Sequence, residues 1–178
     1  HGYLYFGLDG RYTSGSEAVD DHVDRILADI LYDDSLSREE KLYEAYCSIR
    51  DGGYFYMSRP TGWQRGSTYW SLSCAKVMYE TKGGVCYYWA SAFLYLARRL
   101  GYQAYPVCGG VGTANQLHAW VMIEWDDGEE YIFDVELEWA YIRDFYNRGY
   151  TYINMFKQPR NSPSAIYVFP GESASYYG

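Results

Sequence analysis

Apolar residues in the first third of the chain recur at the spacing of amphipathic helices. From Ser16 onward the gaps between them are three and four residues, which predicts a first helix; its apolar positions are Val19, Val23, Ile26, Leu27, Ile30 and Leu31. A second helix is expected from Ser37, because Ser at the N-cap and Glu40 three residues later form a capping box. Its buried face is expected to hold Leu42, Ala45, Tyr46 and Ile49 before the glycine pair 52–53 ends it.

Two more helices are predicted on either side of the glycine pair at 83–84. Before the pair, an apolar spacing indicates a third helix; its apolar residues are Trp70, Cys74, Val77 and Met78. After the pair, the run CYYWASAFLYLARRLG has the strongest helical pattern in the chain, and Gly101 follows its last turn. Cys86 therefore lies in the first turn of this helix.

Downstream of this helix the apolar pattern changes to the two-residue period of strands. Strands are predicted at residues 103–107, 118–125 and 130–135, and the Asp127–Gly128 turn makes the last two a hairpin. Shorter strands are expected at 150–153 and 165–169, whereas 54–66 and 159–163 contain Pro or Gly and are expected to be loops. The order of elements predicts an α+β fold.

The segment 1–15 is a Tyr- and Gly-rich lead-in, and residues 16–178 are expected to form one domain. A chain of 178 residues buries about two thirds of its unfolded surface, enough for a core without disulfides or metals. The chain begins with His1 and shows no signal peptide, so we interpret it as a processed protein or a piece of a longer one.

Charge and composition exclude some classes of partner. Fifteen Lys and Arg against twenty-three Asp and Glu give a net charge of -8. Nucleic acid is therefore not expected as a partner, because phosphate binding needs clustered Lys and Arg side chains. The apolar runs are too short for the ~20 residues of a membrane span. Twenty-three Tyr suggest an exported protein, extracellular or at the cell surface, that meets peptides or glycans. A Tyr-rich core without ligands is the competing interpretation.

The four cysteines favour neither a metal site nor a disulfide framework. The sequence contains no CxxC, so we expect no metal and no other cofactor. If Cys86 is a reactive thiol, three cysteines remain, an odd number for pairing. Cys47, Cys74 and Cys108 are therefore expected to be small buried apolar residues.

Cys86, His118 and Asp134 are the residue types of a nucleophile, a base and an orienting carboxylate. A helix N-terminus favours the thiolate form of cysteine, which is the nucleophile. His118 begins one strand of the predicted hairpin and Asp134 ends the other, so antiparallel pairing brings them together. Each residue alone is more often structural, but the combination indicates a catalytic triad with a thioester intermediate.

The run GGVCYYWASAFLYLARRLGYQAYPVCGG, followed by LHAWVMIEW and YIFDVE, resembles the transglutaminase-like superfamily. Members of that superfamily carry Gly, one further residue and Cys on a helix, then a His-bearing strand and an Asp-bearing strand. The resemblance covers residues 70–136. It implies a papain-like α+β fold of bacterial type, with the Cys-bearing and N-terminal helices packed on an antiparallel sheet, and gives Cys86, His118 and Asp134 the three triad roles. It also implies an upstream oxyanion donor, for which Gln64 and Trp70 are candidates.

The resemblance implies acyl transfer or hydrolysis on peptide or glutamine side-chain amides, with a peptide or protein substrate or a cell-wall polymer as partner. Water is the expected acceptor, and an amine is the alternative. Two other functions stay open at this stage. One is a catalytically idle module of the same fold that binds peptide or cell-wall polymer, and the other is a metal-dependent hydrolase.

Overall fold

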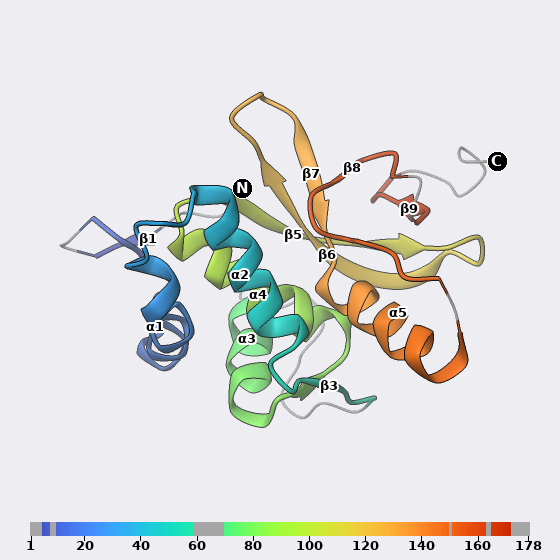
Figure 1. Ribbon diagram of the computed structural model, residues 1–178, viewed down its shortest axis with the longest axis horizontal. Coiled ribbons are helices and arrows are strands. Elements are labelled where there is room, and N and C mark those ends of the chain that lie inside the picture. Colours follow the sequence, from blue (N-terminus) through green and yellow to red (C-terminus); the bar gives the residue numbers. More distant parts are fainter. Residues whose placement is uncertain (1–4, 8–9, 59–69, 150, 163–164, 172–178) are drawn as a thin grey trace.

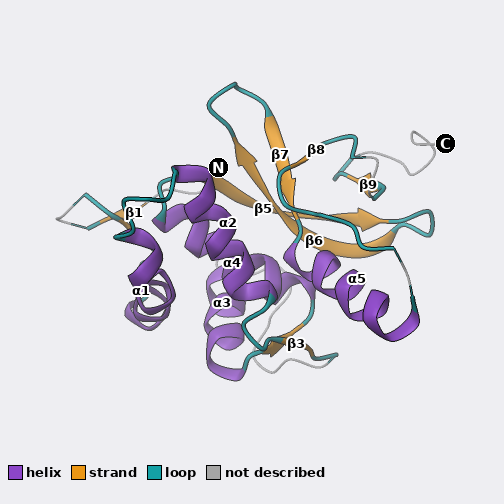
Figure 2. Cartoon of the chain, in the orientation of Figure 1, coloured by secondary structure: helices purple, strands orange, loops and turns teal. Residues whose placement is uncertain are grey.

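The computed structural model describes residues 5–7, 10–58, 70–149, 151–162 and 165–171. Within these residues the chain forms an α+β fold in which helices gather beside one antiparallel sheet (Figure 1, Figure 2). The helices are α1 (Glu17–Leu31), α2 (Arg38–Arg50), α3 (Trp70–Thr81), α4 (Cys86–Arg99) and α5 (Val135–Arg148).

The main sheet has the strand order β8-β7-β6-β5-β9, and every neighbouring pair is antiparallel. Its strands are β5 (Gln103–Val111), β6 (Gln116–Glu124), β7 (Glu130–Phe133), β8 (Gln158–Pro159) and β9 (Tyr167–Val168). Two small pairs lie outside it: β1 (Tyr5–Phe6) with β2 (Tyr12–Thr13), and β3 (Phe55–Tyr56) in parallel with β4 (Gly83–Gly84).

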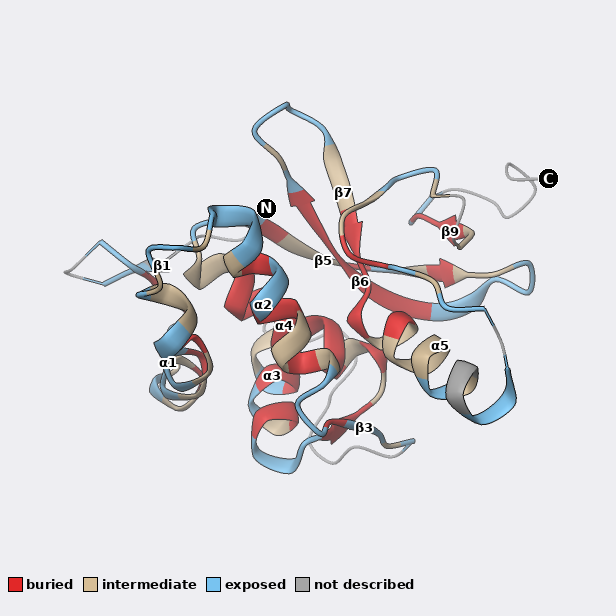
Figure 3. Cartoon of the chain, viewed as in Figure 1, coloured by how far each residue is buried: buried red, intermediate tan, exposed pale blue. Residues whose placement is uncertain are grey.

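Helix α4 and β6 are buried along most of their length (Figure 3). Helix α4 is the centre of the main core, and β6 separates this core from a smaller one. Because side chains alternate along a strand, β6 sends Ala119, Val121 and Ile123 to the core that contains α4. Trp120 and Met122 point to the other face, where they pack with residues of β9 and of the C-terminal segment, the part of the chain that follows α5. The sheet is therefore buried on both faces along β6.

Most of the predicted elements are confirmed. Ser37 accepts a hydrogen bond from the N–H of Glu40, and the Glu40 carboxylate accepts one from the N–H of Ser37, so the capping box is present. The Cys-bearing helix begins at Cys86 as expected, and the 118–125 and 130–135 segments form the expected hairpin as β6 and β7. Periodicity located these elements because their buried faces are apolar.

Helix α5 was not predicted from the sequence. We expected the strand at 130–135 to continue to Val135, but the chain turns into a helix after Phe133. No Gly or Pro in the sequence marks the change from strand to helix. The helix also buries the carboxylate of Glu138, although a glutamate in the sequence suggests a surface position. The strand expected at 150–153 is also wrong for residues 151–153, which have no regular structure.

Several strands differ in extent from the prediction, and for β5 a glycine allows a close approach. Strand β5 runs on to Val111, and a Cβ on Gly109 would lie 2.3 Å from the carbonyl oxygen of Val168. Glycine at 109 therefore lets β9 pair with β5. The described part of the expected loop at 54–66 contains the short strand β3, the expected loop at 159–163 begins with the last residue of β8, and Gly83–Gly84 is itself a strand.

The lead-in packs onto the domain through Tyr12. Its ring is 6% exposed and belongs to the main core, and the Arg98 guanidinium donates a hydrogen bond to its hydroxyl at 3.3 Å. The side chain of Asp20 on α1 accepts a hydrogen bond from the N–H of Ser14 at 2.9 Å. Of the described helices, none has the length and apolar character needed to cross a bilayer.

Glu138 holds α5 to α2 and to the C-terminal segment. Its carboxylate is fully buried and pairs with Arg50 Nη1 at 2.6 Å. It also accepts hydrogen bonds from the hydroxyls of Tyr46 and Tyr152 and from the N–H of Met155. These donors offset the cost of burying the charge.

We expect Glu138→Ala to lower the free energy of unfolding by about 3–5 kcal/mol, because it leaves several buried donors without an acceptor. Urea denaturation measures this loss. Glu39→Ala is the matched control, because Glu39 forms an exposed ion pair with Lys157 at 2.9 Å, and exposed pairs contribute about 0–1 kcal/mol. Equal losses in the two variants would contradict the structural role of Glu138.

Candidate active site

Cys86 is the first residue of α4, and the glycine pair of β4 comes just before it. The carbonyl of Gly84 accepts a hydrogen bond from the Trp89 indole N–H at 3.1 Å, so the segment before Cys86 is held to α4. A Cβ on Gly84 would lie 2.3 Å from the Cβ of Tyr88, so only glycine fits there. Because a helix leaves its first N–H groups without intrahelical partners, this position favours an anion.

His118 lies on β6 opposite Gly109 of β5 and is 5% exposed. Its ring stacks on Trp120, with centroids 6.3 Å apart, because residues two apart on a strand share a face. Its Nε2 lies 2.7 Å from Oδ2 of Asp134. Two of the three expected site residues are therefore in direct contact.

Asp134 lies between β7 and α5, and each of its polar groups is held. Its Oδ1 accepts a hydrogen bond from the N–H of Leu137 at 3.0 Å, so Asp134 caps the first turn of α5. Its own N–H donates to the carbonyl of Met155 at 3.1 Å, and its carbonyl accepts from the Tyr46 hydroxyl at 3.0 Å. The carboxylate that faces His118 is thus fixed in position.

Cys86 adjoins this pair, because its thiol is one of the groups that raise the pKa of the His118 ring. Asp134 holds Nε2, so Nδ1 is the nitrogen left for Cys86. Burial lowers the pKa of His118, but the charge and hydrogen bond of Asp134, together with Cys86, outweigh it and raise that pKa well above its usual value. The ring therefore favours the protonated form, which suits an ion pair with a thiolate.

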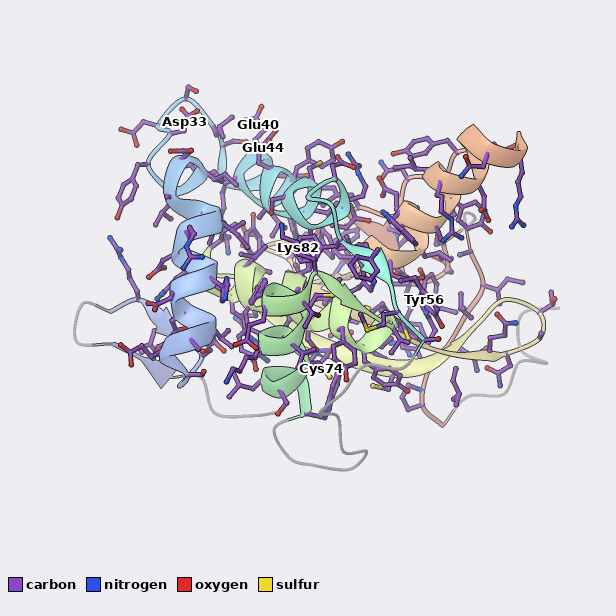
Figure 4. All side chains as sticks on the ribbon, turned by 90° about the horizontal axis from the view of Figure 1, so that it is seen from below. Asp33, Glu40, Glu44, Tyr56, Cys74 and Lys82 are labelled. Atoms are coloured by element: carbon purple, nitrogen blue, oxygen red, sulfur yellow. The ribbon has the colours of Figure 1, made fainter. Side chains whose placement is uncertain are left out.

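The other three cysteines differ from Cys86 in their surroundings. Burial raises the pKa of Cys74 to about 12, and it also raises the pKa of Cys47. All four cysteines are free. Cys74, on α3 (Figure 4), is buried as expected, but Cys47 is only partly buried and Cys108 is exposed, so that expectation is wrong for Cys108.

Tyr167 is a residue of this group that the sequence did not reveal. Its hydroxyl donates a hydrogen bond to Oδ2 of Asp134 at 2.7 Å, the same oxygen that faces His118. Burial and the charge of Asp134 raise the pKa of Tyr167 well above its usual value, so the hydroxyl stays protonated and donates. Tyr167 comes from β9, 33 residues after Asp134, and no motif links the two positions.

We expect Tyr167→Phe to shift the alkaline limb of the pH–activity profile upward by roughly 0.5–1 unit. Without the hydroxyl, the Asp134 carboxylate interacts more strongly with the protonated ring, which raises the pKa of His118 further. Tyr95→Phe is the matched control, because the Tyr95 hydroxyl is also buried but contacts Ser71 Oγ at 3.1 Å. An unchanged or downward-shifted limb in Tyr167→Phe would contradict this role.

Glu136 adds a second carboxylate beside the ring. Its Oε2 lies 3.8 Å from His118 Nδ1, and its side chain is 14% exposed. His118, Asp134 and Glu136 offer ligand atoms within 4.8 Å of one another, so this set could hold a metal ion. However, Nε2 and Oδ2 already face each other at 2.7 Å, and a shared metal would have to separate them. Elemental analysis tests the expectation of no metal.

The two oxyanion candidates are not brought to the thiol by any described contact. Gln64 lies outside the described residues. Trp70 begins α3, packs against the main core and meets the ring of Tyr87 edge to face at 5.6 Å. Its role as an oxyanion donor stays a prediction.

Among known families, the model of the transglutaminase-like superfamily matches the chain over residues 27–135. This is more than half of the chain, and it includes Cys86, His118 and Asp134. Glu136, Glu138 and Tyr167 lie beyond it. No curated protein is similar enough in sequence to count as a match.

Among solved structures, the chain is similar to a proposed cysteine protease from Cytophaga hutchinsonii, with 18% identity and a TM-score of 0.48 over 66% of this chain and 37% of that one. It is similar to an arylamine N-acetyltransferase from Mycobacterium abscessus, with 20% identity and a TM-score of 0.41 over 69% and 45%. It is also similar to arylamine N-acetyltransferase C from Bacillus anthracis, with 17% identity and a TM-score of 0.37 over 67% of this chain and 48% of that one. The chain thus spans less than half of each of these proteins.

Proposed function

The chain belongs to the transglutaminase-like superfamily, and we propose that it is a thiol enzyme that cleaves or transfers the acyl group of peptide or glutamine side-chain amides through Cys86. The observation that carries this proposal is the 2.7 Å contact of His118 with Asp134, in a ring whose pKa the Cys86 thiol also raises. A buried histidine with a raised pKa between a thiol and a carboxylate is the arrangement that covalent thiol catalysis needs.

In the first half of the reaction the Cys86 thiolate attacks the amide carbon. The first turn of α4 presents backbone N–H groups that suit the developing oxyanion. The protonated His118 ring gives its Nδ1 proton to the leaving amine, and a thioester with Cys86 remains. Asp134 keeps the ring oriented through Nε2.

In the second half the neutral His118 ring takes a proton from the acceptor as the acceptor attacks the thioester. Water is the acceptor we propose, and the Cys86 thiolate leaves as the ring becomes protonated again. Because the acceptor gives its proton to Nδ1, the groups around Nδ1 decide whether water or an amine reacts.

A peptide or protein substrate is supported by two exposed aromatic residues on β3. Phe55 and Tyr56 (Tyr56 is labelled in Figure 4) are 45% and 50% exposed. They pair with Gly83 and Gly84, two to three residues before Cys86. Flat exposed rings beside a nucleophile suit contacts with an extended peptide. An extracellular or cell-surface location fits such a substrate and stays part of the proposal.

The test is to incubate the protein with peptides, glutamine-containing peptides and activated esters and to search for acyl adducts by mass spectrometry. We expect a thioester on Cys86 and none on the other cysteines. Binding without any adduct or turnover across the panel would instead support the idle binding module.

A further inference from the structure

Glu136 lies where a reacting molecule would meet the His118 ring. It is the second residue of α5, and its Oε2 is 3.8 Å from Nδ1, the nitrogen that Asp134 does not hold. Within the described part of the chain, no group donates a hydrogen bond to the Glu136 carboxylate. Glu138, two residues later, accepts from four donors, so the lack of donors at Glu136 is not a general feature of α5.

Resting on the function proposed above, we propose that Glu136 holds the water molecule that hydrolyses the Cys86 thioester. Once Cys86 is acylated, the neutral ring offers the Nδ1 lone pair as an acceptor, and the Glu136 carboxylate offers a second one. A water molecule about 2.8 Å from each atom fits an acceptor separation of 3.8 Å. Both O–H groups then point at the two acceptors, and the oxygen lone pairs are left for the thioester carbon.

The reaction that follows is balanced without a further reactant. The water oxygen bonds to the acyl carbon and the C–S bond breaks, so Cys86 leaves as thiolate. One water proton passes to Nδ1 of His118, which restores the resting ion pair, and the other stays on the carboxylic acid product. Glu136 orients the water and takes no net proton.

The charges around Glu136 are compatible with this role. Burial raises the pKa of Glu136 to about 6; His118 on β6 and Arg143 on α5 oppose the rise, and Asp134 adds to it. Tyr167 of β9 also interacts with it electrostatically. At neutral pH the side chain is therefore a carboxylate that can accept a hydrogen bond, and its partial exposure leaves a path for water.

The experiment follows p-nitrophenyl acetate turnover by the parent protein and by Glu136→Gln. We expect an equal initial burst from both proteins, because acylation of Cys86 does not need the bound water. The steady rate should fall about 10- to 100-fold in the variant, and acetyl-Cys86 should accumulate in its mass spectrum. Added hydroxylamine should raise the variant's rate more than the parent's, because it attacks without the water site. Glu124→Gln, at the exposed far end of β6, is the charge-matched control.

The outcomes separate this inference from the proposed function. A burst with an unchanged steady rate in Glu136→Gln overturns the inference and leaves the proposed function standing. A smaller or slower burst in the variant would show that Glu136 supports the triad itself, which also overturns it. Release of p-nitrophenolate by the parent no faster than by Cys86→Ala overturns the proposed function. If the parent binds a stoichiometric metal ion and the variant does not, Glu136 is a metal ligand, and the water-holding role is overturned.

Discussion

Cys86→Ala is expected to lower kcat by about 10⁴-fold or more on any substrate that the protein turns over, because no other group in the site can form the acyl intermediate. The fold should persist, since alanine is a good helix residue and Cys86 lies in the first turn of α4. Steady-state kinetics and circular dichroism measure the two effects.

The control for this loss is Cys47→Ala. Cys47 is a free, partly buried thiol on α2, and burial raises its pKa, so its removal should leave kcat within about twofold of the parent value. A similar loss in both variants would point to a general effect of cysteine removal. Retention of most activity in Cys86→Ala would remove the nucleophile from the mechanism.

Asp134→Asn is expected to lower kcat by about 10³- to 10⁴-fold. An asparagine NH₂ group facing Nε2 of His118 would donate where the carboxylate accepts, which places the ring proton on Nδ1 and blocks its role as a base. It would also leave the Tyr167 hydroxyl without its charged acceptor. The pKa of His118 should fall, because the Asp134 charge is one of the groups that raise it.

Asp126→Asn is the control for Asp134→Asn, because Asp126 is 83% exposed and pairs only at the surface with Arg38 at 3.0 Å. Its kcat should match the parent value. His118 titration by NMR separates a catalytic from a structural cause in Asp134→Asn. A folded variant with an unchanged His118 pKa would contradict the role of Asp134.

The sequence predicts the parts of this fold whose pattern is local. Helices α1, α2 and α4 have apolar stripes, Ser37 and Glu40 form a capping box, and the Asp127–Gly128 turn joins two alternating strands. For the same reason the sequence singles out Cys86, His118 and Asp134, because each stands at the boundary of an element that the pattern predicts.

The remaining parts depend on tertiary contacts that no local pattern records. Helix α5 is stabilised by the buried ion pair of Glu138 with Arg50, 88 residues away, and Tyr167 reaches Asp134 from a two-residue strand. The sequence does not single out Glu136, because a glutamate two residues after an aspartate resembles a solvated surface. Its position beside His118 follows only from the turn of the chain into α5.

The most direct test of the central claim is the rate of alkylation of each cysteine by iodoacetamide as a function of pH. The account predicts that Cys86 is modified well below the pH at which Cys47, Cys74 and Cys108 react, and that Asp134→Asn removes this difference. If Cys86 reacts no faster than the other three thiols near neutral pH, the ion pair with His118 does not form and the proposed chemistry is wrong.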